Sequence, residues 1–135
     1  MGKNIKQPGF QKGSKISKPA PNDLKEDDCL VFSFRHTQSN HCISKCIDKE
    51  KLNLLDSLFQ RRSMRWKEII IADRHKLGSE KIARTSLKVT VPDFVPKDAN
   101  IWALRFSDLA PMVGYYEKNT FYILWLDRQF KVYKH

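Results

Sequence analysis

The sequence predicts an α+β fold: an N-terminal strand, a two-helix hairpin, and then an antiparallel sheet of three or four strands. Three observations carry this prediction. A short run of β-branched and aromatic residues stands near residue 30, two segments with helical spacing follow it, and alternating apolar stretches fill much of residues 101–133. That order is typical of a meander with two helices packed against it. A chain of 135 residues suits a single domain.

The first 24 residues differ in composition from the rest of the chain. Lys, Gly, Pro, Ser and Gln dominate them, with few apolar side chains. Such a segment buries too little surface to offset its ordering entropy. We therefore expect a flexible basic tail over 1–24 and a single α+β domain over 25–135. The tail lysines either strengthen binding to a phosphate backbone or simply keep a leader solvated.

The first strand and the first helix are predicted from local patterns. Residues 29–34, CLVFSF, read as a strand because they are short, β-branched and aromatic. Residues 49–60 have helical spacing, with Leu52, Leu55 and Phe59 on one side and Leu54 and Leu58 beside them. We expect that side to face the core.

A second helix is predicted over residues 64–77. Ser63 is a suitable N-cap for it, and Gly78 stands where a C′ glycine would end it. Its apolar face would consist of Trp66, Ile69 and Ile70. The two helices therefore form a hairpin after the first strand.

The strands of the second half are predicted at 101–107, 112–116 and 121–126. Residues 130–133 either continue the last strand or add a fifth. Residues 81–96 are ambiguous: SLKVTVPDF alternates like a strand, but its prolines suit only a sheet edge.

Alternation assigns the strand residues to faces of the sheet. Arg105 is expected on the face opposite Trp102 and Phe106. In the last strand, Phe121 and Trp125 are expected to share one face. Because both faces of this strand are apolar, we expect the sheet to be covered on both sides.

The charge of the chain indicates a polyanionic partner. Twenty-five Lys and Arg against fifteen Asp and Glu give a net charge of +10, which favours RNA or DNA. Residues 61–88 hold nine basic and three acidic side chains. The alternatives are an ordinary solvated helix face and a surface for an acidic protein. The candidate nucleic-acid-binding residues are Arg61, Arg62, Arg65, Arg74 and Lys76.

Three cysteines form no even disulfide set, and HTQSNHCISKC is a weak match to a zinc site because it lacks a second ligand pair. We expect reduced thiols, no metal and no cofactor. No stretch approaches the roughly 20 apolar residues of a membrane span, and no apolar secretory leader is visible. The expected location is the cytoplasm, with no membrane partner.

The second half of the chain resembles the RelE-like toxins, the family of RelE, YoeB and HigB. The residues that carry the resemblance are ALRFS at 103–107, MVGY at 112–115, the hairpin EKNT at 117–120, and the basic, aromatic end KVYKH. The element order extends the resemblance to 29–135. The second arginine of the family pattern is missing, and Pro111 and Met112 stand in its place.

The resemblance implies an endoribonuclease that cuts messenger RNA, with the ribosome as a setting and an acidic antitoxin as a partner. It directs attention to Arg105, Arg128, Tyr133 and His135 as catalytic candidates. Cleavage by the 2′-hydroxyl of RNA needs no metal. It needs a guanidinium for the developing charge, an imidazole as acid or base, and a phenol that orients or stacks. His75, between two basic residues, is read as a helix-cap histidine. The alternative is a non-catalytic RNA- or DNA-binding protein, or an interaction module, of the same fold.

Overall fold

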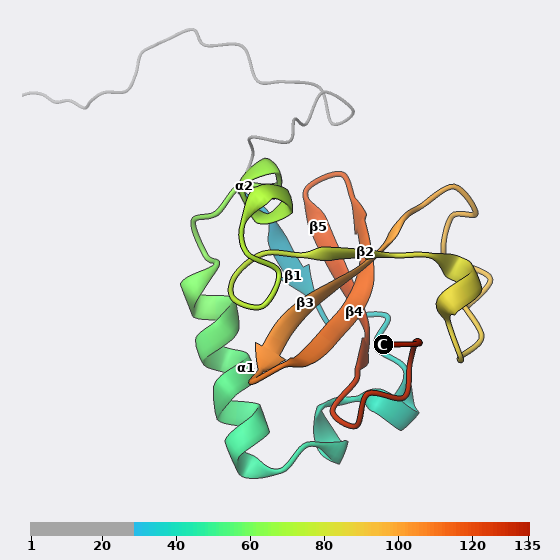
Figure 1. Ribbon diagram of the computed structural model, residues 1–135, viewed down its shortest axis with the longest axis horizontal. Helices are drawn as coiled ribbons and strands as arrows, with labels where there is room; N and C mark the ends of the chain where they lie inside the picture. Colours follow the sequence, from blue (N-terminus) through green and yellow to red (C-terminus); the bar gives the residue numbers. More distant parts are fainter. Residues whose placement is uncertain (1–28) are drawn as a thin grey trace, which may run out of the picture.

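A computed structural model describes residues 29–135 (Figure 1), so the tail expected over residues 1–24 lies outside the described part. The predicted α+β class is confirmed. One mixed sheet has the strand order β1-β5-β4-β3-β2, in which β1 is parallel to β5 and the other neighbours are antiparallel. The elements are β1 (Val31–Ser33), α1 (Asp48–Gln60), α2 (Trp66–Ile71), β2 (Glu80–Ile82), β3 (Ile101–Ser107), β4 (Ala110–Glu117) and β5 (Thr120–Leu126), with short 3-10 turns at Ser39–His41, Ile43–Lys45 and Arg84–Ser86.

The sheet separates two apolar clusters, as the apolar character of both faces predicted. Leu54 of α1 and Trp66 of α2 pack with Leu104 of β3 on one side. Val95 and Val132 pack with Ala103 and its neighbours on the other side. Figure 1 shows the helices along one side, and residues 83–99 with the chain end along the other.

The predicted faces of β5 need one correction. Val113 pairs with Trp125 but the next residue, Gly114, pairs with Ile123, so Leu124 is an extra residue in β5. This β-bulge reverses the alternation. Phe121 therefore belongs to the helix-side cluster, whereas Trp125 lies with Leu124 on the opposite side. A Cβ at Gly114 would lie 1.9 Å from the carbonyl oxygen of Tyr122, so the close approach of β4 and β5 requires glycine here.

Helix α1 begins and ends close to its predicted bounds, but the wrong face was assigned to the core. Leu52, Leu55 and Phe59 are 66%, 61% and 60% exposed, whereas Leu54 is fully buried. The buried side also carries Ser57, whose hydroxyl donates to the carbonyl of Arg105 in β3 at 3.1 Å. Polar anchoring to the strand, rather than the most apolar stripe, sets the rotation of this helix.

Helix α2 is shorter than predicted. It ends at Ile71 rather than Leu77, and its N-cap is Arg65, whose backbone N–H donates to Glu68, rather than Ser63. The reason lies in Asp73, whose side chain accepts from the backbone N–H of His75 at 2.9 Å. Asp favours such local turns over helix. Gly78 N–H then donates to the Asp73 carbonyl at 2.9 Å, which closes residues 72–78 into a loop.

The edge strand of the sheet is Glu80–Ile82, not the alternating segment around residues 86–94. Residues 130–133 form no regular strand. They make one bridge, between Tyr133 and Leu87, and the backbone N–H of Lys88 donates to the Val132 carbonyl at 2.7 Å. Within residues 29–135, no helix has the length and apolar character needed to cross a bilayer.

Candidate functional site

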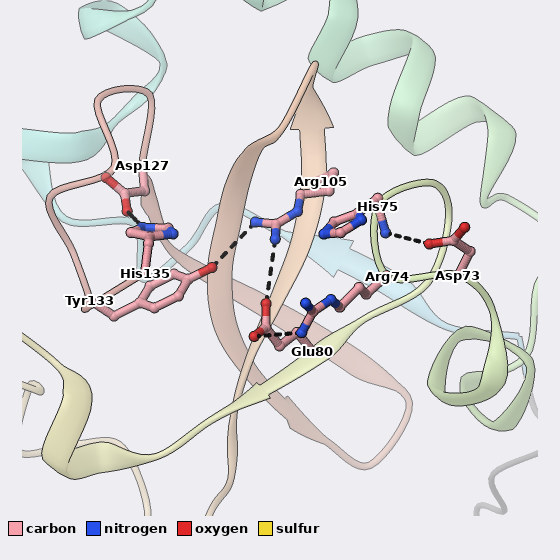
Figure 2. A network of polar contacts seen from close by, with 8 residues as sticks. All are labelled: Asp73, Arg74, His75, Glu80, Arg105, Asp127, Tyr133 and His135. Atoms are coloured by element: carbon pink, nitrogen blue, oxygen red, sulfur yellow. Dashed lines mark hydrogen bonds and ion pairs between the residues drawn. The ribbon is translucent and has the colours of Figure 1, made fainter.

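The side chain of Arg105 is the centre of a polar network that joins three segments of the chain (Figure 2). Its Nη1 donates to the hydroxyl of Tyr133 at 3.3 Å, and its Nη2 lies 3.4 Å from Oε1 of Glu80 in β2. The side chain is only 10% exposed. The structure thus brings Arg105 and Tyr133 together on one side of the sheet, as the alternation and the position of Tyr133 in the sequence predicted.

Two features of this arginine leave it able to take another acceptor. Its Nε is buried and has no hydrogen-bond partner among the described residues. Buried nitrogens of this kind are uncommon in native proteins and often mark a functional site. In addition, the second carboxylate oxygen of Glu80 is 3.1 Å from Nη1 of Arg74. Glu80 therefore has a second cation, which would still pair with it if it separated from Arg105.

The chain end reaches the network because Asp127 holds it. The Asp127 carboxylate is almost fully buried and accepts from the backbone N–H groups of Lys131 at 2.7 Å and Val132 at 3.0 Å. One of its oxygens also lies 3.6 Å from Nε2 of His135. The His135 ring in turn stacks against Tyr133, with 4.1 Å between ring centroids. His135 thus joins Arg105 and Tyr133 in the same site.

The phenol of Tyr133 remains protonated at neutral pH. Burial raises its pKa, and the hydrogen bond from Arg105 opposes that shift only in part. A neutral phenol with a raised pKa can orient the guanidinium and can donate its own proton, but it is a poor base.

His75 is a site residue that the sequence did not reveal. His75 and Arg105 line the same cleft, and Figure 2 draws both near the network. The turn of Asp73 brings it there, because residues 72–78 leave the helix and fold back toward β3. The sequence does hold a signal for this loop, because an Asp side chain can accept from the backbone N–H two residues on and so favours a turn over a continuing helix.

A cleft of about 610 Å³ lies next to this network, between α1 and the 72–78 loop. Arg105, His75 and Lys76 contribute its basic groups. Its acidic groups are Asp56, Asp73 and Asp108, and two amides, one hydroxyl and the apolar residues Ala72, Leu77 and Phe106 complete the lining. The cleft is therefore partly apolar and mixed in charge.

Arg61 does not belong to a nucleic-acid-binding surface, so this prediction is wrong. Its side chain is fully buried. It donates to the carbonyls of Leu77 at 3.0 Å, Lys76 at 3.1 Å and Arg105 at 3.1 Å, and also to the hydroxyl of Ser57. Burial lowers its pKa to about 10, so it is still charged at neutral pH. Arg61 braces α1, the 72–78 loop and β3, and no phosphate can reach it.

The other four predicted binding residues are exposed, but they lie in two places. Arg74 and Lys76 belong to the 72–78 loop, at the Arg105 site. Arg62 and Arg65 lie at the junction of α1 and α2. The guanidinium of Arg62 covers the ring of Phe59, 3.9 Å from its centroid.

Arg128 lies outside the Arg105 network. Its Nε is 2.7 Å from Oε1 of Glu50, which ties the end of β5 to α1. Burial alone would raise the pKa of Glu50, but hydrogen bonds from Arg128 and from the backbone of Ile47 lower it below its ordinary value. Arg128 also lines a second hollow of about 270 Å³, together with His41, Lys45 and Lys131.

The residues of the described part contain no group of three or more His, Cys, Asp or Glu side chains arranged to hold a metal ion. Cys42 and Cys46, with Cys29, are free thiols. Hydrogen bonds to Ser44 lower the pKa of Cys42, whereas burial raises that of Cys46.

No protein-family model, curated protein or solved structure matches the chain. The resemblance to RelE-like toxins therefore depends on the element order and on the residues of the second half alone.

Proposed function

We propose that the chain is a RelE-like endoribonuclease that cleaves messenger RNA at the Arg105 site. The observation that supports this proposal most is the meeting of Arg105, Tyr133 and His135, residues whose chemistry suits phosphodiester cleavage. The net charge of +10 agrees with an RNA substrate. The resemblance further suggests the ribosome as the setting and an acidic antitoxin protein as the partner that silences the activity.

The chemistry would proceed by in-line displacement. The 2′-hydroxyl attacks the adjacent phosphorus, the bond from phosphorus to the 5′-oxygen breaks, and a 2′,3′-cyclic phosphate and a 5′-hydroxyl result. One imidazole takes the proton of the 2′-hydroxyl and the other donates a proton to the 5′-oxygen. His75 lines the same cleft as Arg105, and His135 contacts Tyr133, so two different segments each supply an imidazole near the site. Arg105 neutralises the charge of the phosphorane.

Phosphate binding would require Arg105 to exchange one partner. Glu80 is the group to be displaced, because its carboxylate lies at 3.4 Å from Arg105 and at 3.1 Å from Arg74. Arg74 can retain Glu80 while the phosphate takes Nη2 and the unpaired Nε of Arg105. Tyr133 meanwhile holds Nη1 and keeps the guanidinium plane in position.

The test is cleavage of a messenger RNA in a cell-free translation reaction, with ribosomes present and absent. Wild-type protein is expected to yield fragments with 2′,3′-cyclic phosphate ends, and a 2′-O-methyl group at the cut position is expected to block them. Arg105→Lys, which keeps the charge but loses the planar fork, is expected to reduce the rate by roughly 100-fold or more. Glu80→Gln is expected to strengthen RNA binding, because a neutral amide competes less with phosphate. Lys118→Ala, in the β4–β5 turn, is the matched control for removal of a positive charge.

Intact messenger RNA in every reaction with folded wild-type protein would falsify the cleavage proposal. A full cleavage rate in Arg105→Lys and Tyr133→Phe, with melting temperatures retained, would remove those residues from the chemistry.

A second candidate function is RNA binding without cleavage. It is favoured by the low exposure of Arg105 and by the occupation of both of its terminal nitrogens. In this alternative the basic surface binds the RNA backbone, and the polar network around Arg105 only stabilises the fold. Filter binding would then show an affinity that falls steeply with salt while the RNA stays intact. Arg105→Lys would leave that affinity unchanged, whereas Lys76→Ala would weaken it.

A further inference from the structure

The outer face of α1 carries an apolar stripe that the fold does not use. Leu52, Leu55 and Phe59 are each about 60% exposed or more, and their spacing of three and four residues places them along one side of the helix. Figure 1 shows α1 at the edge of the molecule, with its other side toward the sheet and no described element outside it. Contiguous exposed apolar side chains of this kind mark interaction sites in soluble proteins.

The exposure of the stripe does not mean that α1 lacks contacts with the core. Leu54, fully buried, packs against the sheet, and Ser57 and Arg61 bond to the backbone of β3. The inner face of α1 thus makes all of these contacts without the stripe. Polar residues in the stripe would leave them unchanged.

The two ends of the stripe carry opposite charges. The same alternation of four and three residues extends from Phe59 to Arg62 and from Leu52 back to Asp48, the first residue of α1. Arg62 belongs to the stripe in space as well as in sequence, because its guanidinium covers the Phe59 ring at 3.9 Å. An acid therefore stands at one end and a base at the other, with the apolar residues between them.

We propose that this face binds a second copy of the chain, with the two α1 helices antiparallel. A two-fold axis near Leu55 brings Leu52 of each copy opposite Phe59 of the other, and Asp48 opposite Arg62. The charges select this arrangement because a two-fold interface must be self-complementary, and the stripe is so only when the helices run in opposite directions. Asp56, the acid nearest the axis, already receives a hydrogen bond from Gln60 of its own helix at 2.7 Å.

The dimer is expected to be weak. Stable interfaces bury about 800 Å² on each partner, which is more than three partly exposed side chains provide. The association should therefore depend on concentration. It involves none of the residues of the Arg105 network, so it stands or fails separately from the proposed function.

The experiment is sedimentation equilibrium of the full chain, free of nucleic acid, from about 5 to 500 µM in about 0.15 M salt. The average mass of the wild type is expected to rise from that of one chain toward that of two. Leu55→Glu, which places two like charges at the axis, is expected to hold the mass at one chain. Ile71→Glu makes the same change at an 83% exposed isoleucine outside the stripe and is expected to dimerise like the wild type. Circular dichroism melting checks that each variant is folded.

A charge exchange tests the antiparallel arrangement. Asp48→Arg and Arg62→Asp should each weaken the dimer at least tenfold, because each places like charges opposite one another, and the double variant should recover most of the loss. A wild type that stays at the mass of one chain overturns the proposal, and so does a dimer that Leu55→Glu leaves intact. Failure of the double variant to recover overturns the antiparallel arrangement, because Asp48 and Arg62 would then not lie opposite each other.

Discussion

Adjacent arginines at the end of α1 should respond in opposite ways to the same substitution. Arg61 is fully buried and donates to four acceptors, whereas Arg62 is exposed and contacts Phe59 and its carbonyl. Arg61→Met and Arg62→Met keep most of the apolar stem and remove the guanidinium. From the sequence, both arginines were predicted to lie on one nucleic-acid-binding surface. The two substitutions therefore test the contacts seen in the structure against that prediction.

The magnitude for Arg61→Met follows from its contacts. Each net hydrogen bond contributes about 1 kcal/mol, so four would contribute about 4 kcal/mol. The Arg105 carbonyl retains the Ser57 hydroxyl at 3.1 Å, and removal of a buried charge recovers part of its desolvation cost. We expect the free energy of unfolding to fall by about 3 kcal/mol. For Arg62→Met we expect a change within about 0.5 kcal/mol.

Urea unfolding followed by tryptophan fluorescence measures the stability, since Trp66 and Trp125 are buried in the two clusters. Filter binding to single-stranded RNA measures the affinity at several salt concentrations. Because Arg61 cannot reach a phosphate, the slope of log affinity against log salt concentration, corrected for the folded fraction, should not change in Arg61→Met. If Arg62 neutralises one phosphate, Arg62→Met would lower that slope by about 0.7. Arg61→Lys, which keeps the charge, provides a milder variant should Arg61→Met fold poorly.

Equal, small losses of stability for Arg61→Met and Arg62→Met would refute this reasoning, because they would mean that Arg61 is solvated. A reduced salt slope in Arg61→Met with stability unchanged would indicate that Arg61 belongs to the binding surface.

Three further predictions concern the helix, the chain end and one ion pair. Leu54→Ala should cost about 2–5 kcal/mol, and Leu55→Ala less than about 0.5 kcal/mol, in urea unfolding of dilute protein; the reverse order would return the outer stripe to the core. Asp127→Asn should leave one of the two backbone N–H groups at residues 131 and 132 unpaired and speed its hydrogen exchange by tenfold or more, with β4 amides as the internal control. Arg128→Ala should lower the free energy of unfolding at pH 7, because it removes the hydrogen bond to Glu50. Because the pKa of Glu50 is lowered in the folded state, this difference is present above its ordinary pKa and should vanish as the pH falls through the lowered value; a difference that remains once Glu50 is protonated would contradict it.

Alternation predicted the sheet well because it reports directly on which side chains face the core. The bounds of β3 were correct, and Arg105 lies on the expected face. Alternation fails where a strand gains a residue, and the bulge at Leu124 is such a place. No local signal in FYILWL distinguishes a bulge from a regular strand, since every residue there is apolar or aromatic.

Helical spacing was less reliable because it finds the most apolar stripe, not the buried one. In α1 the two lie on different sides of the helix, and the buried side is the one from which Ser57 and Arg61 bond to a strand some 44 to 48 residues away. Such long-range contacts leave no trace in a window of one helix. His75 was missed for a different reason, because its place in the cleft depends on the early end of α2, and the local signal for that end, Asp73, lay inside the predicted helix.

The buried carboxylate of Asp127 contributes to the order of the chain end and to the formation of the site. Regular sheet pairing stops at Leu126, and the next residue, Asp127, is almost fully buried. Burial of a charge is unfavourable unless donors surround it, and here the backbone N–H groups of the following turn are those donors, with His135 nearby. Satisfying Asp127 therefore turns the chain back on itself, and that turn carries Tyr133 to Arg105. The interactions that assemble the site also order the terminal residues. The alternating, aromatic end of the chain is therefore ordered although it forms no regular strand.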